Sequence, residues 1–112
     1  MANIQTIDFC LDDIYRIDWL CNFPNLQELH IVNQGLSEIE GIDKCRFLQR
    51  LWLTANEIDT IRQLDRLTML RQLFLSSNKI RRIRCIDRCT FLEKLWLDDN
   101  RIEQIDGIQS LT

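Results

Sequence analysis

The one histidine of the chain is where covalent chemistry would have to begin. His30 has a possible partner in Cys10, which falls on a neighbouring strand in the repeat pattern set out below. A nucleophilic cysteine needs a base within hydrogen-bond reach and a third group that orients this base. The sequence offers no such third group, and a single histidine leaves no other way to build a Ser-His-Asp triad. We therefore predict that the protein is not an enzyme.

Metal and cofactor sites are equally poorly supported. Cys85 and Cys89 lie four residues apart, but no second ligand pair completes a zinc motif. Asp98, Asp99 and Asn100 are adjacent oxygen ligands without the spacing or the glycine of a calcium loop. The three glycines, at 35, 41 and 107, form no phosphate-binding loop. The sequence predicts no metal and no cofactor.

An apolar pattern that recurs every 22 residues organises the chain. The frames span residues 4–25, 26–47, 48–69, 70–91 and 92–112 of a single domain, 1–112. The same positions are apolar in every frame; one of these columns reads Ile7, Leu29, Leu51, Leu73 and Leu95. Another column contains Cys45 and Cys89 where other frames have Phe or Leu, so we expect these two thiols in the core. The chain has five cysteines, and we predict no disulfides.

The spacing of the apolar columns predicts the local structure of each frame. Alternation, as in residues 51–53, is typical of a short strand, and the later apolar positions fall three apart, which favours a tight helical return of the 3₁₀ type. One such unit cannot bury its own apolar face, so the frames must stack. Because each frame runs in the same direction, we predict an α/β solenoid with a parallel sheet and short helical or 3₁₀ return segments on the convex side.

A polar column closes the strands of three successive frames: Asn56, Asn78 and Asn100. An amide side chain can donate and accept hydrogen bonds at once, so it can link the backbone of one frame to the next. The first two frames have Asp12 and Gln34 instead, and we expect the N-terminal frames to be less regular for this reason.

The segment from Leu70 to Ile80, LRQLFLSSNKI, resembles the leucine-rich-repeat consensus, and LWLTAN and LWLDDN repeat its core. The 22-residue frame is similar to the intracellular subfamily typified by the nuclear regulatory subunit of protein phosphatase 1, whose relatives include axonemal and ciliary proteins. The resemblance implies a concave strand surface that binds a protein partner, with aromatic and acidic contacts at the positions of Trp52, Phe74, Trp96, Asp98 and Asp99.

Between the apolar columns of the strands runs a column that must face solvent, and it reads Asp8, His30, Trp52, Phe74 and Trp96. Neighbouring strands lie about 4.8 Å apart, so these rings form one stripe. Exposed aromatics of this kind are typical of binding hot spots. Alternatively, the rings stack on each other and stabilise the sheet without any partner. Both interpretations follow from the sequence, and we favour binding.

Polar residues border this stripe, as at the rim of a protein interface. Those included in the candidate site are Glu28, Arg50, Lys94, Asp98 and Asp99. With His30, Trp52, Phe74 and Trp96 they form the predicted partner-binding site. A five-strand face projects only roughly 400 Å², less than the about 800 Å² of a standard interface, so further repeats or the turns would have to contribute.

Charge and composition narrow the class of partner. The net charge is −3, and the stripe carries more acids than bases, which argues against nucleic acid. No segment has the length or composition of a membrane span or a secretory signal, so we expect an intracellular, cytoplasmic protein, with ciliary or nuclear residence also compatible. The first hypothesis is a non-catalytic protein-binding scaffold or phosphatase-type regulator. The alternatives are a structural segment of a ciliary or cytoskeletal repeat protein, or a ribonucleoprotein component.

Two further features lie outside the stripe. The basic residues Lys79, Arg81, Arg82, Arg84 and Arg88 fall in one return segment, where Glu57, Asp59, Glu103 and Asp106 of neighbouring frames could neutralise them, so we expect a solvated, salt-bridged surface. The sequence ends inside the fifth frame without a capping unit. We therefore expect a fragment of a longer repeat protein whose open sheet edge could self-associate.

Overall fold

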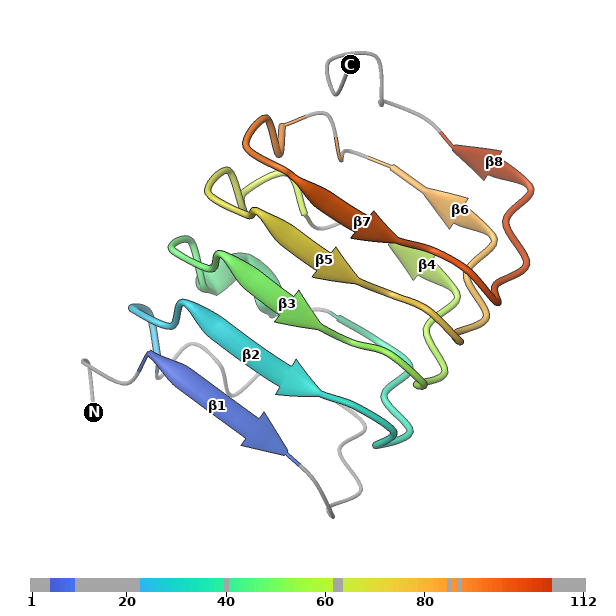
Figure 1. The fold of residues 1–112 in the computed structure, drawn as a ribbon, viewed down its shortest axis with the longest axis horizontal. Coiled ribbons are helices and arrows are strands. Elements are labelled where there is room, and N and C mark those ends of the chain that lie inside the picture. The colour runs from blue at the N-terminus through green and yellow to red at the C-terminus, as the bar shows by residue number, and fades with distance from the viewer. Residues whose placement is uncertain are drawn as a thin grey trace.

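The 22-residue frames stack as a solenoid in the computed structural model, in which residues 5–9, 23–39, 41–61, 64–84, 86 and 88–105 are described (Figure 1). One strand per coil contributes to a five-stranded parallel sheet of order β1-β2-β3-β5-β7. These strands are β1 (Thr6–Phe9), β2 (Glu28–Ile31), β3 (Arg50–Trp52), β5 (Gln72–Phe74) and β7 (Lys94–Trp96). The predicted solenoid with a parallel sheet is confirmed.

The register of this sheet follows the sequence repeat. Residues 22 positions apart pair across neighbouring strands, so Leu29 lies opposite Leu51, and Leu51 opposite Leu73. Every buried apolar residue of the described part belongs to a predicted apolar column. The leucines at alternate strand positions therefore form the core, while the residues between them remain on the open face of the five-stranded sheet.

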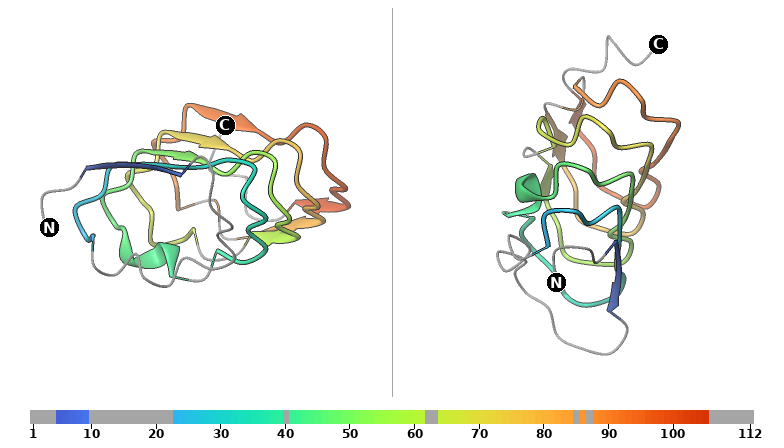
Figure 2. Two further views of the ribbon diagram at one scale, coloured as in Figure 1. Left: turned by 90° about the horizontal axis from the view of Figure 1, so that it is seen from below. Right: turned by 90° about the vertical axis from the view of Figure 1, so that its left-hand side faces the viewer.

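The return segments differ in part from the prediction. Among the described residues, one coil has the expected 3₁₀ turn, η2 (Ile42–Lys44). Three later coils also contribute two-residue strands, β4 (Thr60–Ile61), β6 (Arg82–Ile83) and β8 (Gln104–Ile105), to a second parallel sheet of order β4-β6-β8. In the view along the stack, this small sheet and the 3₁₀ turn lie on the side away from the five-stranded sheet (Figure 2, left).

The asparagine column links the coils as predicted. Asn56 Oδ1 accepts hydrogen bonds from the backbone N–H groups of Gln34 (3.0 Å) and Leu36 (3.1 Å). Its Nδ2 donates to the carbonyl oxygens of Ile31, 2.6 Å away in the preceding coil, and Leu53, 2.9 Å away in its own coil. Asn78 and Asn100 repeat the arrangement one and two coils later. Each amide thereby satisfies backbone groups that the turn would otherwise bury without partners.

Gln34 replaces asparagine in this column and keeps the equivalent of one of its contacts, the one that Asn56 Nδ2 makes to the Thr54 carbonyl oxygen. Its Nε2 donates to the Val32 carbonyl oxygen at 2.9 Å, within its own coil. The longer side chain is buried, as are Asn56 and Asn78. Asp12, the other departure from the column, lies outside the described residues, so the expectation about the first frames stays a prediction.

The residue before each described position of this column has left-handed backbone geometry. These residues are Asn33 (φ 58°), Ala55 (φ 61°), Ser77 (φ 59°) and Asp99 (φ 57°). Left-handed geometry costs a residue with a Cβ roughly 1–2 kcal/mol, less for Asn and Asp, whose side chains bond locally. In these four coils the turn is therefore strained, and this geometry places the following Asn or Gln side chain between neighbouring coils.

This geometry predicts that Ala55→Val destabilises the protein by about 1–2 kcal/mol, because a β-branched side chain tolerates positive φ poorly. Ala55→Gly should change the unfolding free energy little, since relief of strain and the greater freedom of the unfolded chain offset each other. Urea unfolding of both variants checks the prediction. A valine variant as stable as the parent would contradict the left-handed turn.

Cys45 and Cys89 occupy the core as predicted, and both are thiols. The Cys89 sulfur lies 3.5 Å from the carbonyl oxygens of both Leu64 and Leu67. In this column the small polarisable thiol replaces a leucine or phenylalanine. Cys10 and Cys85, considered above for catalysis and for metal binding, lie outside the described residues.

Candidate functional site

Four rings follow one another across the open face of the five-stranded sheet. His30 and Trp52 are stacked, with ring centroids 4.1 Å apart and planes 11° apart. Trp52 and Phe74 are stacked at 4.7 Å and 12°, whereas Phe74 and Trp96 meet edge to face at 5.3 Å and 69°. We call these four residues the aromatic stack. The in-register parallel strands place the rings beside one another, because each ring occupies the same position in its frame.

The exposure of the stack is uneven. His30, Trp52 and Phe74 are half-buried, and Trp96 is 55% exposed. Stacking covers ring faces, so the first three residues present mainly their edges, which carry positive partial charge. Asp8, the first position of the predicted stripe, lies opposite His30 in the strand register. The ring stacking weighed as an alternative to binding is therefore present, and it leaves Trp96 largely open.

Two predicted rim residues, Glu28 and Arg50, lie beside His30 at one end of the stack. Glu28 accepts from His30, with Nε2 and Oε1 3.1 Å apart, and it pairs with Arg50, whose guanidinium nitrogen lies 3.7 Å from Oε2. Arg50 is exposed, and such surface pairs contribute about 0–1 kcal/mol each. The contacts orient the imidazole at the edge of the stack. Among the described residues, no nucleophilic side chain takes part in these contacts.

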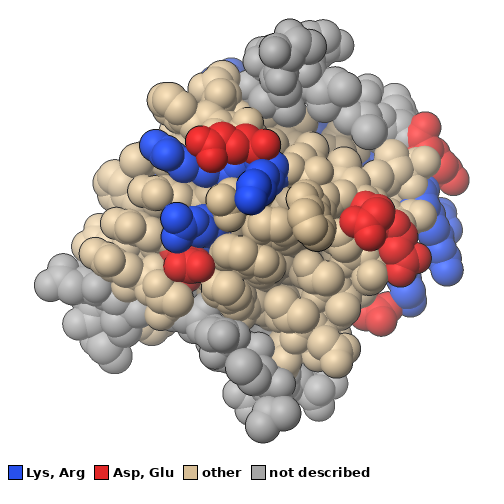
Figure 3. Space-filling view, viewed as in Figure 1, with Lys and Arg blue, Asp and Glu red and all other residues tan. Residues whose placement is uncertain are grey.

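Asp98 and Asp99 lie just beyond the carboxyl end of β7, the last strand of the five-stranded sheet. Ser76 Oγ donates to Asp98 Oδ1, and Ser77 Oγ donates to Asp99 Oδ2 at 3.0 Å. Both carboxylates belong to exposed residues, and Lys94 is exposed at the other end of β7. Figure 3 shows two groups of charged side chains on this face, one toward the upper left and one at the right, with uncharged side chains between them. The predicted site residues thus lie on one face, with rings between charged borders.

A second apolar row escaped the sequence analysis. Phe47 (50% exposed), Met69 (39%) and Phe91 (61%) occupy the position just before each frame opens. Together with Val32 and Trp96 they are the exposed large hydrophobic residues of the described part. The 22-residue alignment contains the signal, but Asn25 in the first frame breaks the column. We call these three residues the edge row.

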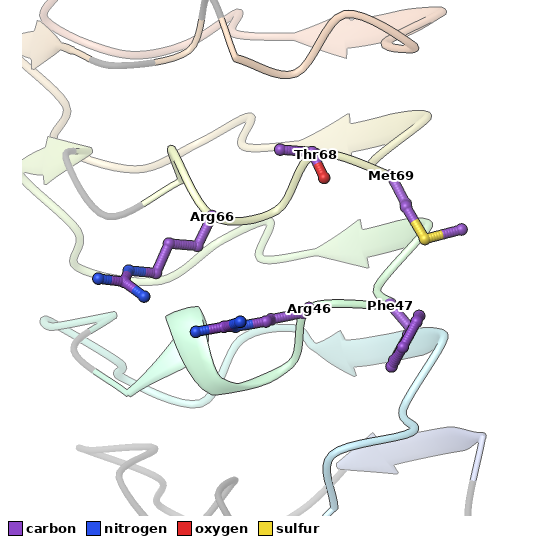
Figure 4. A pocket seen from close by; sticks show the side chains of 5 residues that line it. All are labelled: Arg46, Phe47, Arg66, Thr68 and Met69. Carbon is purple, nitrogen blue, oxygen red and sulfur yellow. The ribbon is translucent and has the colours of Figure 1, made fainter.

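An open hollow of about 390 Å³ lies beside the edge row. Its lining consists of Arg46, Phe47, Arg66, Thr68 and Met69. In the close view, Phe47 and Met69 lie one above the other near the starts of their strands, and the two arginines extend away from them in a common direction (Figure 4). Apolar and basic side chains therefore border the hollow on different sides.

The predicted salt-bridged character of the basic run is confirmed for Lys79, whose Nζ lies 2.5 Å from Glu57 Oε2. Arg81, Arg82 and Arg84 are exposed on or beside β6, and within the described residues none of them takes part in an ion pair. Asp106, one of the predicted neutralising acids, lies outside those residues. The salt-bridged character of the run is therefore confirmed at Lys79 and stays a prediction for its arginines.

The described residues bring no three His, Cys, Asp or Glu side chains together in a group that could hold a metal ion. Among the same residues, no helix has the length and apolar character needed to cross a membrane. The arrangement that does recur from coil to coil is aromatic and apolar, and its chemistry is that of non-covalent contact.

Comparison with known families and structures agrees with the geometry. A family model described as leucine-rich repeats, in two copies, matches residues 24–66 and 68–110, well over half of the chain. A search of curated protein sequences gives no match.

Solved structures extend the comparison. An internalin from Listeria monocytogenes is 25% identical, with a TM-score of 0.84 over 99% of this chain and 33% of its own. A Leptospira interrogans leucine-rich-repeat protein is 23% identical, with a TM-score of 0.90 over 98% of this chain and 29% of its own. An Arabidopsis thaliana receptor-kinase ectodomain, solved with Casparian strip integrity factor 2, is 22% identical, with a TM-score of 0.79 over 98% of this chain and 14% of its own. This chain thus spans a third or less of these three proteins, and the likeness to the last two concerns the fold alone.

Proposed function

The chain belongs to the leucine-rich-repeat family, and from this premise we propose that it is a non-catalytic interaction module whose open strand face binds a protein partner. Domains of this family are typically protein-interaction modules. The repeat forms a rigid, extended face on which equivalent positions of successive coils can have different side chains. In this chain, the equivalent positions on the open face of the five-stranded sheet have mostly aromatic side chains.

The observation that carries the proposal is the aromatic stack ending in Trp96. A side chain of this size that is 55% exposed leaves roughly 100 Å² to be covered by a partner. Its neighbours hold it in place, since the Phe74 ring lies 5.3 Å away and the stack continues to His30. A preorganised aromatic loses little conformational entropy on binding, which is why such residues dominate hot spots.

The charged residues on both sides of the stack indicate which charges a partner surface would carry. Asp98 and Asp99 favour a basic group near Trp96, while Lys94 and Arg50 at the opposite ends of their strands favour an acidic one. A cation could also rest against the Trp96 ring. We propose a partner surface with a large apolar or basic anchor between groups of mixed charge.

The finer resemblance suggests a setting for this module. The 22-residue frame and the acidic and aromatic positions support a role like that of the nuclear regulatory subunit of protein phosphatase 1, that is, a phosphatase-type regulator in the cytoplasm, nucleus or cilium. The segment from Phe23 to Val32 is also similar to leucine-rich-repeat-containing protein nine. The competing proposal is a structural segment of a ciliary or cytoskeletal repeat protein, in which the stack packs against another part of the same polypeptide.

A ribonucleoprotein role is the third candidate, because aromatic rings can stack on bases. Stacked rings, however, have already covered one another's faces, and the carboxylates of Asp98 and Asp99 beyond the end of β7 repel phosphate. If RNA were the ligand, affinity would fall steeply with added salt. A protein interface anchored by Trp96 would depend on salt much less.

Affinity capture from cell lysate tests the proposal. The parent chain and Trp96→Ala are immobilised after circular dichroism has confirmed that both are folded, and recovered proteins are identified by mass spectrometry. We expect a protein recovered by the parent and lost with the variant. Equal recovery by both would contradict binding through the stack. Recovery of RNA-dependent complexes alone, abolished by ribonuclease, would favour the ribonucleoprotein alternative.

A further inference from the structure

We propose a second docking surface: the edge row of Phe47, Met69 and Phe91, with the hollow beside it, binds an amphipathic acidic helix of a partner protein. This surface lies at the starts of the strands and shares no residue with the aromatic stack. The inference therefore goes beyond the proposed function and can fail independently of it.

Exposure is the first argument. Three of the five exposed large hydrophobic residues among the described ones fall in this single column, at exposed fractions of 50%, 39% and 61%. Scattered exposed hydrophobics are normal on a protein surface, whereas a contiguous row of them marks an interaction site. Turns of this kind are usually polar, and Asn25 fills the equivalent position of the first frame.

Spacing identifies the shape of the occupant. Side chains of successive coils lie about 4.8 Å apart, so the edge row spans roughly 10 Å over three coils. Residues i, i+3 or i+4, and i+7 of a helix cover about 10.5 Å along one face. An extended segment places every second side chain on one face, at intervals of about 6.6 Å, and would fall out of step with the row. A helix lying along the stack matches the row best.

Charge identifies the composition of that helix. Arg46 and Arg66 line the hollow together with Phe47 and Met69, and no acidic residue lines it. Both arginines are exposed, and within the described residues neither takes part in an ion pair. In Figure 4 they extend along one side of the hollow, away from the apolar side chains. A helix with its apolar face on the edge row would direct a flank of Glu or Asp toward these guanidinium groups.

The remaining charges nearby do not cancel this bias. Lys44 and Arg88 are exposed in the turns that precede Phe47 and Phe91. Asp43 and Asp65 lie in the turns that precede Phe47 and Met69, where Asp43 is half-buried and Asp65 is exposed. Arg71 is already paired with Glu93, with the closest nitrogen and oxygen 3.9 Å apart. Among the residues that the structure describes, four bases and two acids lie in these turns, although the whole chain is acidic, with a net charge of −3.

Area argues against a second copy of this chain as the occupant. The exposed parts of the three side chains amount to roughly 300 Å². A stable protein interface buries about 800 Å² on each partner, so the edge row is too small to hold a dimer together. It suits a short segment of a larger partner whose other contacts lie elsewhere.

A fluorescence-anisotropy titration tests this inference. The probe is a fluorescein-labelled synthetic peptide of about 18 residues, with leucine at i, i+3 or i+4, and i+7 and glutamate on the flank, long enough to populate a helix. A peptide with lysine in place of the glutamates and one with a central proline serve as controls. We expect the glutamate peptide to bind the parent chain at least about tenfold more tightly than either control.

Two variants locate the binding. Met69→Ser and Arg66→Glu both change exposed side chains, so circular dichroism should show the parent fold, and each should weaken the glutamate peptide about tenfold or more. Trp96→Ala should leave this affinity unchanged, because it belongs to the other surface. Unchanged binding by Met69→Ser, or equal binding of the glutamate and lysine peptides, would overturn the inference. So would a parent dimer in sedimentation that Met69→Ser dissociates, since the occupant would then be a second copy.

Discussion

Asn56→Ala should lower the free energy of unfolding by about 2–4 kcal/mol. The amide is buried, and its Oδ1 accepts from two backbone N–H groups while its Nδ2 lies 2.6 Å from a carbonyl oxygen of the preceding coil. Alanine leaves these backbone groups buried without partners, and each costs about 1–3 kcal/mol. The loss also uncouples neighbouring coils, on which the stability of a repeat protein depends. Urea unfolding monitored by circular dichroism measures the effect.

Asn56→Asp distinguishes the hydrogen-bond acceptor role of this amide from its donor role. An ionised carboxylate retains the acceptor but cannot donate to Ile31 and Leu53, so we expect at least as large a loss of stability. Thr90→Ala, at an exposed turn position, is the control and should stay within about 0.5 kcal/mol of the parent. An Asn56→Ala variant as stable as the Thr90 variant would contradict the bridging role of the column.

Trp52→Ala is expected to destabilise the protein by about 2–3 kcal/mol. Trp52 lies inside the aromatic stack, 4.1 Å from the His30 ring and 4.7 Å from the Phe74 ring. Each aromatic pair contributes about 0.5–1.5 kcal/mol beyond the area it buries, and truncation also removes the half-buried part of the indole. Thermal unfolding should show a clear fall in Tm, measured under the same conditions for parent and variant.

Two substitutions show whether stacking is the cause. Trp52→Phe preserves a ring between its neighbours and should recover most of the lost stability. Trp96→Ala removes a ring that is largely exposed and contacts Phe74 edge to face, so it should cost about 1 kcal/mol or less. If Trp52→Ala and Trp96→Ala have equal effects on Tm, stacking of the inner rings does not stabilise the sheet.

Much of the fold could be predicted because the repeat presents the same information five times. A single Leu at position 51 is ambiguous, but a column from Ile7 to Leu95 identifies a core position. The asparagine column was predictable for the same reason, since an amide that recurs at the end of successive strands must satisfy backbone groups. Cys45 and Cys89 were placed in the core by their column alone.

The second sheet could not be predicted, because two-residue strands such as Thr60–Ile61 are too short to give an alternating pattern. Their pairing depends on how neighbouring return segments align, which is a property of the stack. The sequence also placed the rings of the candidate site on one face without fixing their orientation. Whether Trp96 stacks or stands edge to face depends on side-chain rotation, which residue spacing does not encode.

The edge row was missed for a different reason. Only columns that are apolar in every frame predict core positions, and Asn25 breaks this column. Exposure gives the column its significance, since Phe47 and Phe91 at buried positions would be ordinary core residues. An exposed apolar column differs from a buried one only in its place in the folded stack, which residue types alone do not give.

The central claim, that the open strand face binds a protein partner, is tested most directly by the affinity of the captured partner for three chains: the parent, Trp96→Ala and Phe91→Ala. Both variants remove one exposed aromatic ring, one from the aromatic stack and one from the edge row. Isothermal titration calorimetry should show a loss of about 2 kcal/mol, roughly 30-fold in Kd, for Trp96→Ala and no change for Phe91→Ala. A partner that binds Trp96→Ala as tightly as the parent would contradict the claim.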